Sequence, residues 1–250
     1  MLKNEREREI INILKADGGF VSVKSMCDAL YASESSVRRD LRALEARGLV
    51  RRSYGGVEPI TNFSDVISFN KRRHHNADAK IRMAKKAVSL VKDGDVIFLD
   101  QSSSAFYLAK ELMDKSGITV VTNNTEIITL MSGTSIKTVS SGGTLSNENR
   151  TCLIGEDAHY IFGRIYADLV FFSTKSLSDD GVISDCSREE VLVRDAMLSN
   201  GARKVYLCDS EKFGTRSAYK QCELADVDFL VSESSEAKRF LGVCESLTVL

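Results

Sequence analysis

Residues 33–57 read SESSVRRDLRALEARGLVRRSYGGV, and this stretch decides how the first part of the chain folds. Three apolar residues recur at the spacing of one helix face, namely Val37, Leu41 and Leu44. Ser33 is suited to cap the helix that contains them, so we predict a helix over residues 34–47. Residues 49–57 then read as two short strands around a glycine turn.

Two shorter helices are predicted before this one. Residues 3–17 carry apolar residues at helical spacing, and Ser22 can cap a second helix that ends near Leu30. Three short helices followed by a hairpin form the winged helix-turn-helix pattern, in which the last helix enters the major groove of DNA. We therefore expect residues 1–60 to form a DNA-binding domain.

The polar side of the predicted third helix carries hydroxyl and arginine side chains, which can bond base edges and phosphates. The wing adds two arginines placed to reach the backbone of flanking DNA. The alternative is a solvated helix whose arginines pair with Asp40 and Glu45, but the cap, the short turn and the glycine-ended wing favour DNA binding. The candidate DNA-binding residues are Ser35, Ser36, Arg38, Arg39, Arg42, Arg51 and Arg52.

The same stretch resembles a known family. Residues 37–45, VRRDLRALE, followed by RSYGGV at 52–57, closely resemble the DNA-binding region of the DeoR family of bacterial transcriptional regulators. The resemblance implies that Val37 lies at the operator together with its serine and arginine neighbours. It also implies that Asp40 helps to hold the arginines in place.

Composition limits the class of protein. The chain has 250 residues, of which 43% are hydrophobic, and its formal net charge is −1. This favours one large folded domain or two smaller ones and excludes a uniformly basic nucleic-acid coat. No run of 18 apolar residues and no signal peptide is present, so we expect no membrane span and a cytoplasmic protein. The six cysteines lack metal-ligand spacing, and we expect neither a metal nor a cofactor.

The charge is unevenly distributed along the chain. Residues 70–86 carry seven lysines and arginines against one carboxylate. This basic segment either follows DNA phosphates or is a charged hinge, and the sequence leaves both readings open. The only proline, Pro59, falls in the turn-rich stretch 54–62, so we place a boundary near residue 60 and a linker over 61–76.

Residues 77–250 alternate between apolar strands and helices. This pattern predicts a mostly parallel sheet covered on both faces, so the fold class is α/β, with an N-terminal winged helix-turn-helix joined to a larger α/β domain. The predicted strands are 96–99, 118–121, 137–140, 169–172, 204–208 and 227–231.

Small polar residues follow the carboxyl ends of these strands, where open α/β sheets bind ligands. Serines that lead into a helix can hold an anion, neutral side chains suit sugar hydroxyls, and cations suit phosphate. The anion candidates are Ser102, Ser103 and Ser104, and the hydroxyl candidates are Thr122, Asn123 and Asn124. The candidate cations are Arg150, Lys175 and Lys212, and the carboxylates at this edge are Asp100 and Asp209.

The resemblance continues through this region. Residues 99–104, 121–124, 141–143, 179–181 and 209–214 look like the effector-sensing domain of the DeoR family, which resembles ribose-5-phosphate isomerase and related sugar-phosphate folds. It implies a phosphorylated sugar as ligand and adds Gly142 and Gly143 to the candidate effector site. Two departures stand out: Ser102 replaces a common glycine, and residues 172–176 lack the glycines often found there.

Three classes of function remain to be distinguished. A sugar-phosphate isomerase would use Asp100 or Asp209 as general base, but a fused DNA-binding module has no obvious use in such an enzyme. A constitutive architectural DNA-binding protein would not need a pocket at the sheet edge. We therefore predict no catalytic residues, and a regulator that binds double-stranded operator DNA and represses a carbohydrate operon under control of a phosphorylated sugar. A homodimer or homotetramer is expected.

Overall fold

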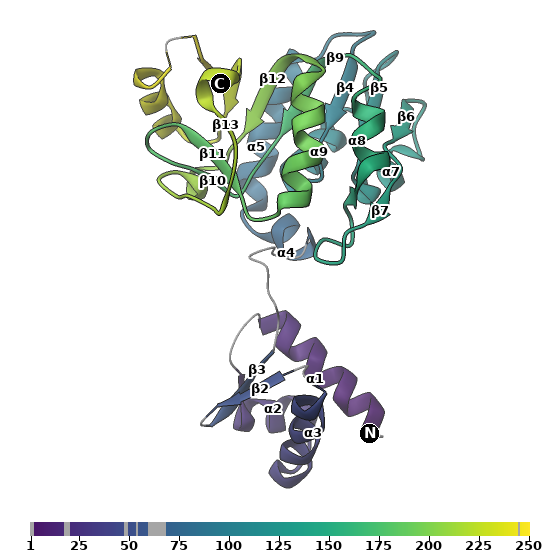
Figure 1. Ribbon diagram of the computed structural model, residues 1–250, viewed down its shortest axis with the longest axis vertical. Helices are drawn as coiled ribbons and strands as arrows, with labels where there is room; N and C mark the ends of the chain where they lie inside the picture. The colour runs from purple at the N-terminus through teal and green to yellow at the C-terminus, as the bar shows by residue number, and fades with distance from the viewer. Residues whose placement is uncertain (1–2, 18–20, 48–49, 54, 60–68, 245) are drawn as a thin grey trace. The chain divides into compact units, whose positions relative to one another are not determined.

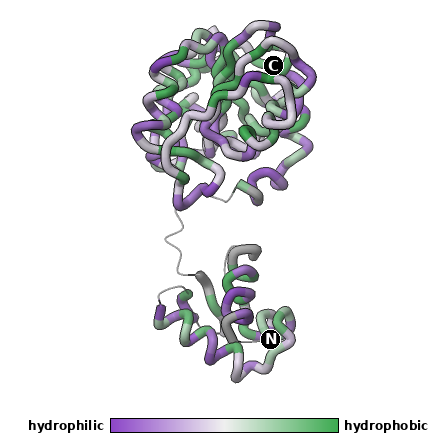
Figure 2. Tube along the Cα trace, turned by 90° about the vertical axis from the view of Figure 1, so that its right-hand side faces the viewer, coloured by the Kyte–Doolittle hydropathy of each residue, from purple (hydrophilic) through white to green (hydrophobic). Residues whose placement is uncertain are grey.

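The computed structural model describes residues 3–17, 21–47, 50–53, 55–59, 69–244 and 246–250. The chain divides into two compact units, Met1–Ser64 and Asp65–Leu250, called here the small unit and the large unit. Figure 2 shows hydrophilic and apolar residues alternating along the helices of the small unit, as expected for helices with one buried side.

The small unit contains the three predicted helices and a three-stranded antiparallel sheet of order β1-β3-β2 (Figure 1). The helices are α1 (Lys3–Asp17), α2 (Val23–Leu30) and α3 (Glu34–Ala46). The strands are β1 (Val21–Ser22), β2 (Val50–Ser53) and β3 (Gly56–Pro59). The winged helix-turn-helix prediction is thereby confirmed.

Caps and apolar spacing explain where these helices begin and how they pack. The Ser22 hydroxyl accepts a hydrogen bond from the Ser25 amide over 3.0 Å and caps α2. Ser33 stands at the cap position of α3, but its side chain makes no cap bond. The core of the small unit is formed by residues of all three helices and the sheet, including Ile10, Leu14, Met26, Val37, Leu41, Leu44, Val50 and Val57.

The large unit is built on a seven-stranded, fully parallel sheet of order β15-β14-β12-β9-β4-β5-β6. Six of the strands match the predicted ones, and β15 at the edge was not predicted. Their bounds are β4 (Val96–Leu99), β5 (Thr119–Thr122), β6 (Lys137–Ser140), β9 (Ala167–Phe172), β12 (Gly201–Leu207), β14 (Phe229–Val231) and β15 (Thr248–Val249).

Helices cover both faces of this sheet, as the continuous apolar strands require. Neighbouring residues of β4 point to opposite faces, so Ile97 belongs to one hydrophobic core and Phe98 to the other. The first core is covered by α5 (Ala77–Ala87), α6 (Ser103–Glu111) and α7 (Thr125–Met131). The second is covered by α8 (Glu156–Phe162) and α9 (Arg188–Ser199), which lie in front of the sheet in Figure 1. The α/β fold class is confirmed.

Several elements lie outside the regular alternation and were not predicted. A second, antiparallel sheet of order β10-β11-β13 joins Ser176–Leu177, Val182–Asp185 and Tyr219–Glu223. A small hairpin pairs β7 (Thr144–Leu145) with β8 (Leu153–Ile154). Short 3-10 helices span Val88–Leu90, Ser210–Lys212, Leu224–Asp226 and Ser235–Gly242.

The predicted linker, residues 61–76, contains helix α4 (Phe69–His74), which belongs to the large unit. Phe69 is 2% exposed, and its ring packs edge-on against Phe106 of α6 with centroids 5.6 Å apart. The Tyr107 hydroxyl donates to the carbonyl oxygen of Arg73 over 3.1 Å. This part of the basic segment is therefore a helix that packs on α6.

Candidate functional site

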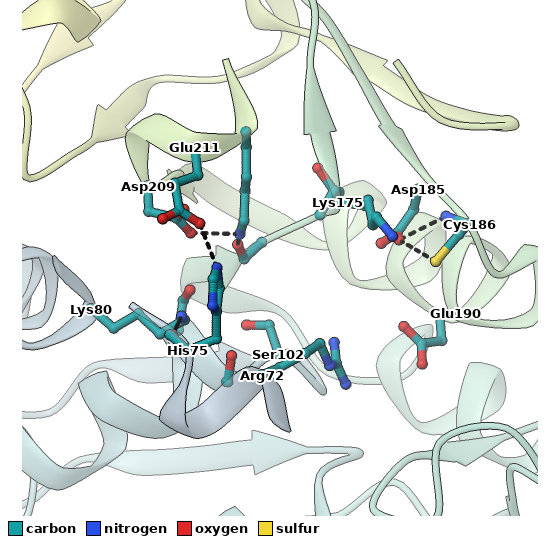
Figure 3. Close-up of a pocket in the computed structure, with 15 residues that line it drawn as sticks. Arg72, His75, Lys80, Ser102, Lys175, Asp185, Cys186, Glu190, Asp209 and Glu211 are labelled. Carbon is teal, nitrogen blue, oxygen red and sulfur yellow. Dashed lines mark hydrogen bonds and ion pairs between the residues drawn. The ribbon is translucent and has the colours of Figure 1, made fainter. Parts of the chain in front are cut away.

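A cavity of about 200 Å³ lies at the carboxyl edge of the sheet in the large unit (Figure 3). Its walls come from the loops after β4, β9 and β12, from the end of β11 with the start of α9, and from α4 and α5. Six of the predicted effector residues line it: Ser102, Ser103, Ser104, Lys175, Asp209 and Lys212. Nine lining residues were not predicted: Arg72, His75, Lys80, Ser173, Thr174, Asp185, Cys186, Glu190 and Glu211.

The serine loop after β4 forms the N-terminus of α6. Ser102 caps the helix by accepting a hydrogen bond from the Ala105 amide over 3.0 Å. The amides of the first helical turn lack carbonyl partners within a helix and carry partial positive charge. The Ser104 side chain is 2% exposed, and its Oγ atom has no hydrogen-bond partner among the described residues. Buried polar atoms are normally paired, so this hydroxyl is available to a ligand.

Lys212 lines the cavity from the 3-10 helix that follows β12. Its ammonium group donates to Ser173 Oγ over 2.7 Å and lies 3.2 Å from Asp209 Oδ2. Burial opposes both charges, but the attraction between them prevails. Lys212 and Lys80 lower the pKa of Asp209, and Asp209 raises the pKa of Lys212. Both groups are therefore charged near neutral pH.

Arg72 projects from α4 into the cavity, on the side of Glu190 in Figure 3. Its Nε and Nη2 atoms are buried and have no hydrogen-bond partner within the described parts of the chain. A guanidinium offers a planar fork of donors that matches the oxygens of a phosphate or carboxylate. Arg72 is thus a cation placed to receive an anionic ligand.

Lys80 brings a further cation to the same wall from α5. It is 4% exposed, and its ammonium group donates to the carbonyl oxygen of His75. Burial and the nearby positive charge of Lys212 lower the pKa of Lys80 to about 8. The charge of Lys80 therefore depends on pH just above neutrality.

Glu190, in the first turn of α9, gives the cavity a wall that accepts hydrogen bonds. Its carboxylate accepts from Gln101 Nε2 and from Asn149 Nδ2, each over 2.8 Å. Burial raises the pKa of Glu190, and the positive charge of Arg72 opposes that rise. The cavity therefore combines several cations with a carboxylate held by two amides, which suits a ligand that carries both an anionic group and hydroxyl groups.

Two of the predicted effector residues instead hold the protein together at this edge. Asp100 is fully buried and accepts hydrogen bonds from the amides of Ser102 and Ser173, each over 3.0 Å. Thr122 donates to the carbonyl oxygen of Leu99 over 2.7 Å. Neither side chain lines the cavity, because each forms hydrogen bonds to the backbone of the segments that it supports.

The remaining predicted effector residues also lie outside the cavity lining. Asn124 caps α7 through its Oδ1 atom, and Asn123 donates to the carbonyl oxygen of Leu153 over 3.1 Å. Gly142 and Gly143 are exposed turn residues with φ of +66° and +100°, which explains the choice of glycine there. Arg150 is exposed, and its guanidinium lies 3.4 Å from Asn147 Oδ1.

The unpredicted lining residues come from elements that the strand pattern does not indicate. Arg72 lies on a short helix inside the predicted linker, and Glu190 lies on a helix that follows the unpredicted strand β11. The only sequence signal for Arg72 is its spacing of three residues from Phe69, which places both on one side of a helix.

In the small unit, α3 presents a row of exposed polar residues. Ser35, Arg38, Arg39 and Arg42 are exposed, as is Arg51 on β2, while Ser36 and Arg52 are half-buried. Arg38 donates to Glu34 over 2.7 Å, and Arg52 donates through its amide to Glu45 over 3.1 Å. Arg39 and Arg42 have no polar partner among the described residues, so their guanidinium groups are available to another molecule.

Two expectations for α3 need correction. The Val37 side chain is fully buried in the core of the small unit, so it supports the helix and cannot reach a base edge. Asp40 is 1% exposed and accepts a hydrogen bond from Arg6 of α1 over 2.5 Å, which also raises the pKa of Arg6. Asp40 therefore ties α3 to α1, and within the described parts of the chain no hydrogen bond or ion pair joins it to an arginine of α3.

The two units together define a DNA-binding regulator with a separate sensor. Residues 6–63 match the model of the DeoR-like helix-turn-helix domain, and residues 75–234 match that of the DeoR C terminal sensor domain. The chain therefore belongs to the DeoR family of transcriptional regulators, as its sequence indicated.

Individual relatives match this chain in sequence over nearly its whole length. The HTH-type transcriptional regulator GlpR of Haloferax volcanii is 28% identical, with 94% of this chain and 91% of that protein covered. The lactose phosphotransferase system repressor of Lactococcus lactis is 28% identical, with 100% of this chain and 98% of that protein covered. Among solved structures, ribose 5-phosphate isomerase A of Methanocaldococcus jannaschii has 21% identity and a TM-score of 0.43, with 55% of each chain covered.

The family decides between the classes of function that the sequence left open. Because the matching domains and the relatives are those of transcriptional regulators, the chain is a DNA-binding regulator and the isomerase alternative is not favoured. The match to a sensor domain likewise disfavours a purely architectural protein. No helix in the described parts of the chain is long and apolar enough to cross a membrane.

Proposed function

We propose that this regulator represses an operon for carbohydrate use, and that a phosphorylated sugar bound in the cavity of the large unit controls its affinity for operator DNA. The observation that carries the ligand class is Arg72, whose buried Nε and Nη2 atoms lack hydrogen-bond partners in the described structure. A buried, unsatisfied guanidinium costs free energy that an anionic group would recover.

The surroundings of Arg72 favour a phosphate over a simple halide or carboxylate. The N-terminus of α6 lies on the same cavity, with the unpartnered Ser104 hydroxyl in its first turn. Helix N-termini, hydroxyl groups and arginine forks together are a common environment for phosphate oxygens. Lys80, Lys175 and Lys212 add positive charge around the cavity.

The sugar part of the ligand is proposed from Glu190, which lies on the side of the cavity toward which Arg72 projects (Figure 3). Glu190 lines the cavity and is fixed by two amide donors, so it can accept a further hydrogen bond without reorienting. A carboxylate held in this way accepts hydrogen bonds from hydroxyl groups at little entropic cost. This supports a ligand with several hydroxyls beside its phosphate.

On DNA, we propose that the exposed side of α3 lies in the major groove and that β2 contacts the flanking backbone. Ser35, Ser36, Arg38, Arg39 and Arg42 would face the groove, and Arg51 and Arg52 the phosphates. The relative from Lactococcus lactis is named a repressor, which supports repression as the direction of regulation. Because one helix reads only a short site, we also propose a homodimer or homotetramer acting in the cytoplasm.

The proposed function can be tested with the full chain. Operator DNA is first enriched from a random duplex library by repeated binding to the protein. Melting temperature and operator affinity are then measured with pentose, hexose and ketose phosphates, with the matching free sugars, and with inorganic phosphate. We expect one phosphorylated sugar to raise the melting temperature and weaken operator binding, while its free sugar does neither. A chain that responds to none of the sugar phosphates would overturn the proposal.

A further inference from the structure

Helix α4 contributes to the cavity and lies near the start of the large unit along the chain. It is the first described element of that unit, and the small unit ends at Ser64, shortly before Phe69. Phe69 anchors α4 in the core against Phe106 of α6. Phe106 stands one turn after the serines of the cavity, so α4 is packed on the helix whose N-terminus faces the ligand site.

Arg72 follows Phe69 by three residues and lies on the same side of α4. Its guanidinium carbon is 5.9 Å from the centre of the Phe69 ring, and its side chain lines the cavity. The other end of α4 is held to the loop after β12. His75 Nε2 lies 2.5 Å from Glu211 Oε2, and Asn76 Nδ2 lies 3.4 Å from Asp209 Oδ1.

The contacts of α4 and the residues after it differ in whether protein atoms alone complete them. His75 and Asn76 find their partners on the loop after β12, whereas Arg72 has two buried donors that no described residue satisfies. The positive charge of Arg72 opposes the rise that burial causes in the pKa of Glu190, but no ion pair within 4 Å joins the two side chains among the described residues. Arg72 is therefore the contact of α4 that an anionic ligand would complete.

We propose that Arg72 couples ligand binding to DNA binding: an anionic group in the cavity fixes α4 through the Arg72 guanidinium and thereby sets the path by which the chain enters the large unit. The inference rests on the proposed function. A ligand shifts a conformational equilibrium only by its difference in affinity for the two states. Arg72 supplies that difference if its bond to the ligand forms only when α4 is docked.

The test separates coupling from simple binding. The variants are Arg72→Gln, which keeps a polar side chain without charge, and Arg72→Lys, which keeps the charge without the fork. The matched control is Arg73→Gln, on the same helix, because Arg73 pairs with Glu126 at 3.5 Å and does not line the cavity. Each full-length variant is titrated with the sugar phosphate that most raises the melting temperature of the wild type.

Two quantities are measured for each variant. The first is the ratio of operator Kd values at saturating ligand and without ligand, and the second is ligand-dependent hydrogen exchange in α4. In the wild type we expect a ratio of about fivefold or more, within the usual range of allosteric coupling, together with slower exchange in α4. In Arg72→Gln at saturation we expect a ratio below about two and unchanged exchange, while Arg73→Gln behaves as the wild type. Arg72→Lys is expected to bind the ligand and to show an intermediate ratio.

The outcomes keep the two proposals apart. If the wild type responds and Arg72→Gln shows the same ratio once saturated, Arg72 is at most a binding residue and the coupling proposal is wrong. If Arg72→Gln binds the ligand without changing operator affinity, coupling through α4 is supported. If the wild type itself responds to no sugar phosphate, the proposed function fails, whatever the variants do.

Discussion

Arg194 donates from its Nε atom to Asp100 Oδ2 over 3.2 Å, and both side chains are almost fully buried. The Nη2 atom of Arg194 donates to Asp185 Oδ2 over 3.1 Å. Although burial opposes its charge, the two carboxylates raise the pKa of Arg194. Because Asp100 also accepts from the amides of Ser102 and Ser173, this network fixes two loops that line the cavity.

Replacing Arg194 should destabilise the large unit strongly. Arg194→Met leaves two buried carboxylates without their partner, and breaking a buried ion pair in this way costs about 3–5 kcal/mol. Calorimetry of the full chain measures the loss as a lower midpoint of one unfolding transition. The control is Arg216→Met, because Arg216 pairs with Asp180 on the surface and such pairs contribute about 0–1 kcal/mol. Equal losses in the two variants would show that the network is not a determinant of stability.

The apolar strands of the large unit could be predicted because a parallel sheet needs continuous apolar runs. Residues 96–99 and 169–172 are such runs, and both are strands. The second sheet could not be predicted in the same way, since β10 has only two residues and β13, which reads YKQCE, is largely polar. Their pairing depends on contacts between distant parts of the chain.

The candidate site was predicted where it follows a strand and missed where it comes from a helix. Ser102 and Lys212 lie in the segments that follow β4 and β12, so the sheet edge indicates them. The same rule also selected Asn123 and Asn124 after β5, but these side chains are used in local hydrogen bonds. Arg72 reaches the cavity from a helix docked by tertiary contacts, such as that of Phe69 with Phe106, which have no strong local pattern.

Arginine substitutions on α3 should weaken operator binding. Arg38→Ala and Arg39→Ala are each expected to cost about 1–3 kcal/mol if they contact bases. Arg39 should have the larger effect, because Arg38 already donates to Glu34 in the free protein. Fluorescence anisotropy at fixed salt measures the affinity, with Arg164→Ala in the large unit as control for the loss of one exposed charge. Unchanged affinity in both variants would remove α3 from the interface.

Lys212→Ala should abolish the response to ligand while leaving operator binding without ligand intact. The substitution removes a cation from the cavity and also the partner that lowers the pKa of Asp209. The control is Lys220→Ala, because Lys220 forms an exposed pair with Glu223 at 2.6 Å. Operator affinity is measured across a ligand titration. A Lys212→Ala protein that responds at the wild-type ligand concentration would exclude Lys212 from the site.

Ligand affinity should fall as the pH rises through about 8, the pKa of Lys80 in the free protein. An anionic ligand favours the charged lysine, so binding above this pH must take up a proton and becomes weaker.

The effect of Lys80 on folding has the opposite sign. Burial puts its folded pKa below the ordinary value of 10.5, so between about pH 8 and 10.5 the unfolded chain binds more protons and this group's contribution to stability rises with pH.

Calorimetric titrations between about pH 7.5 and 9.5 test the predicted fall in ligand affinity, since a phosphate monoester is already fully ionised there. Lys80→Met should bind more weakly at the lower pH and lose most of the pH dependence. A wild type whose affinity is constant over this range would show that Lys80 does not face the bound anion.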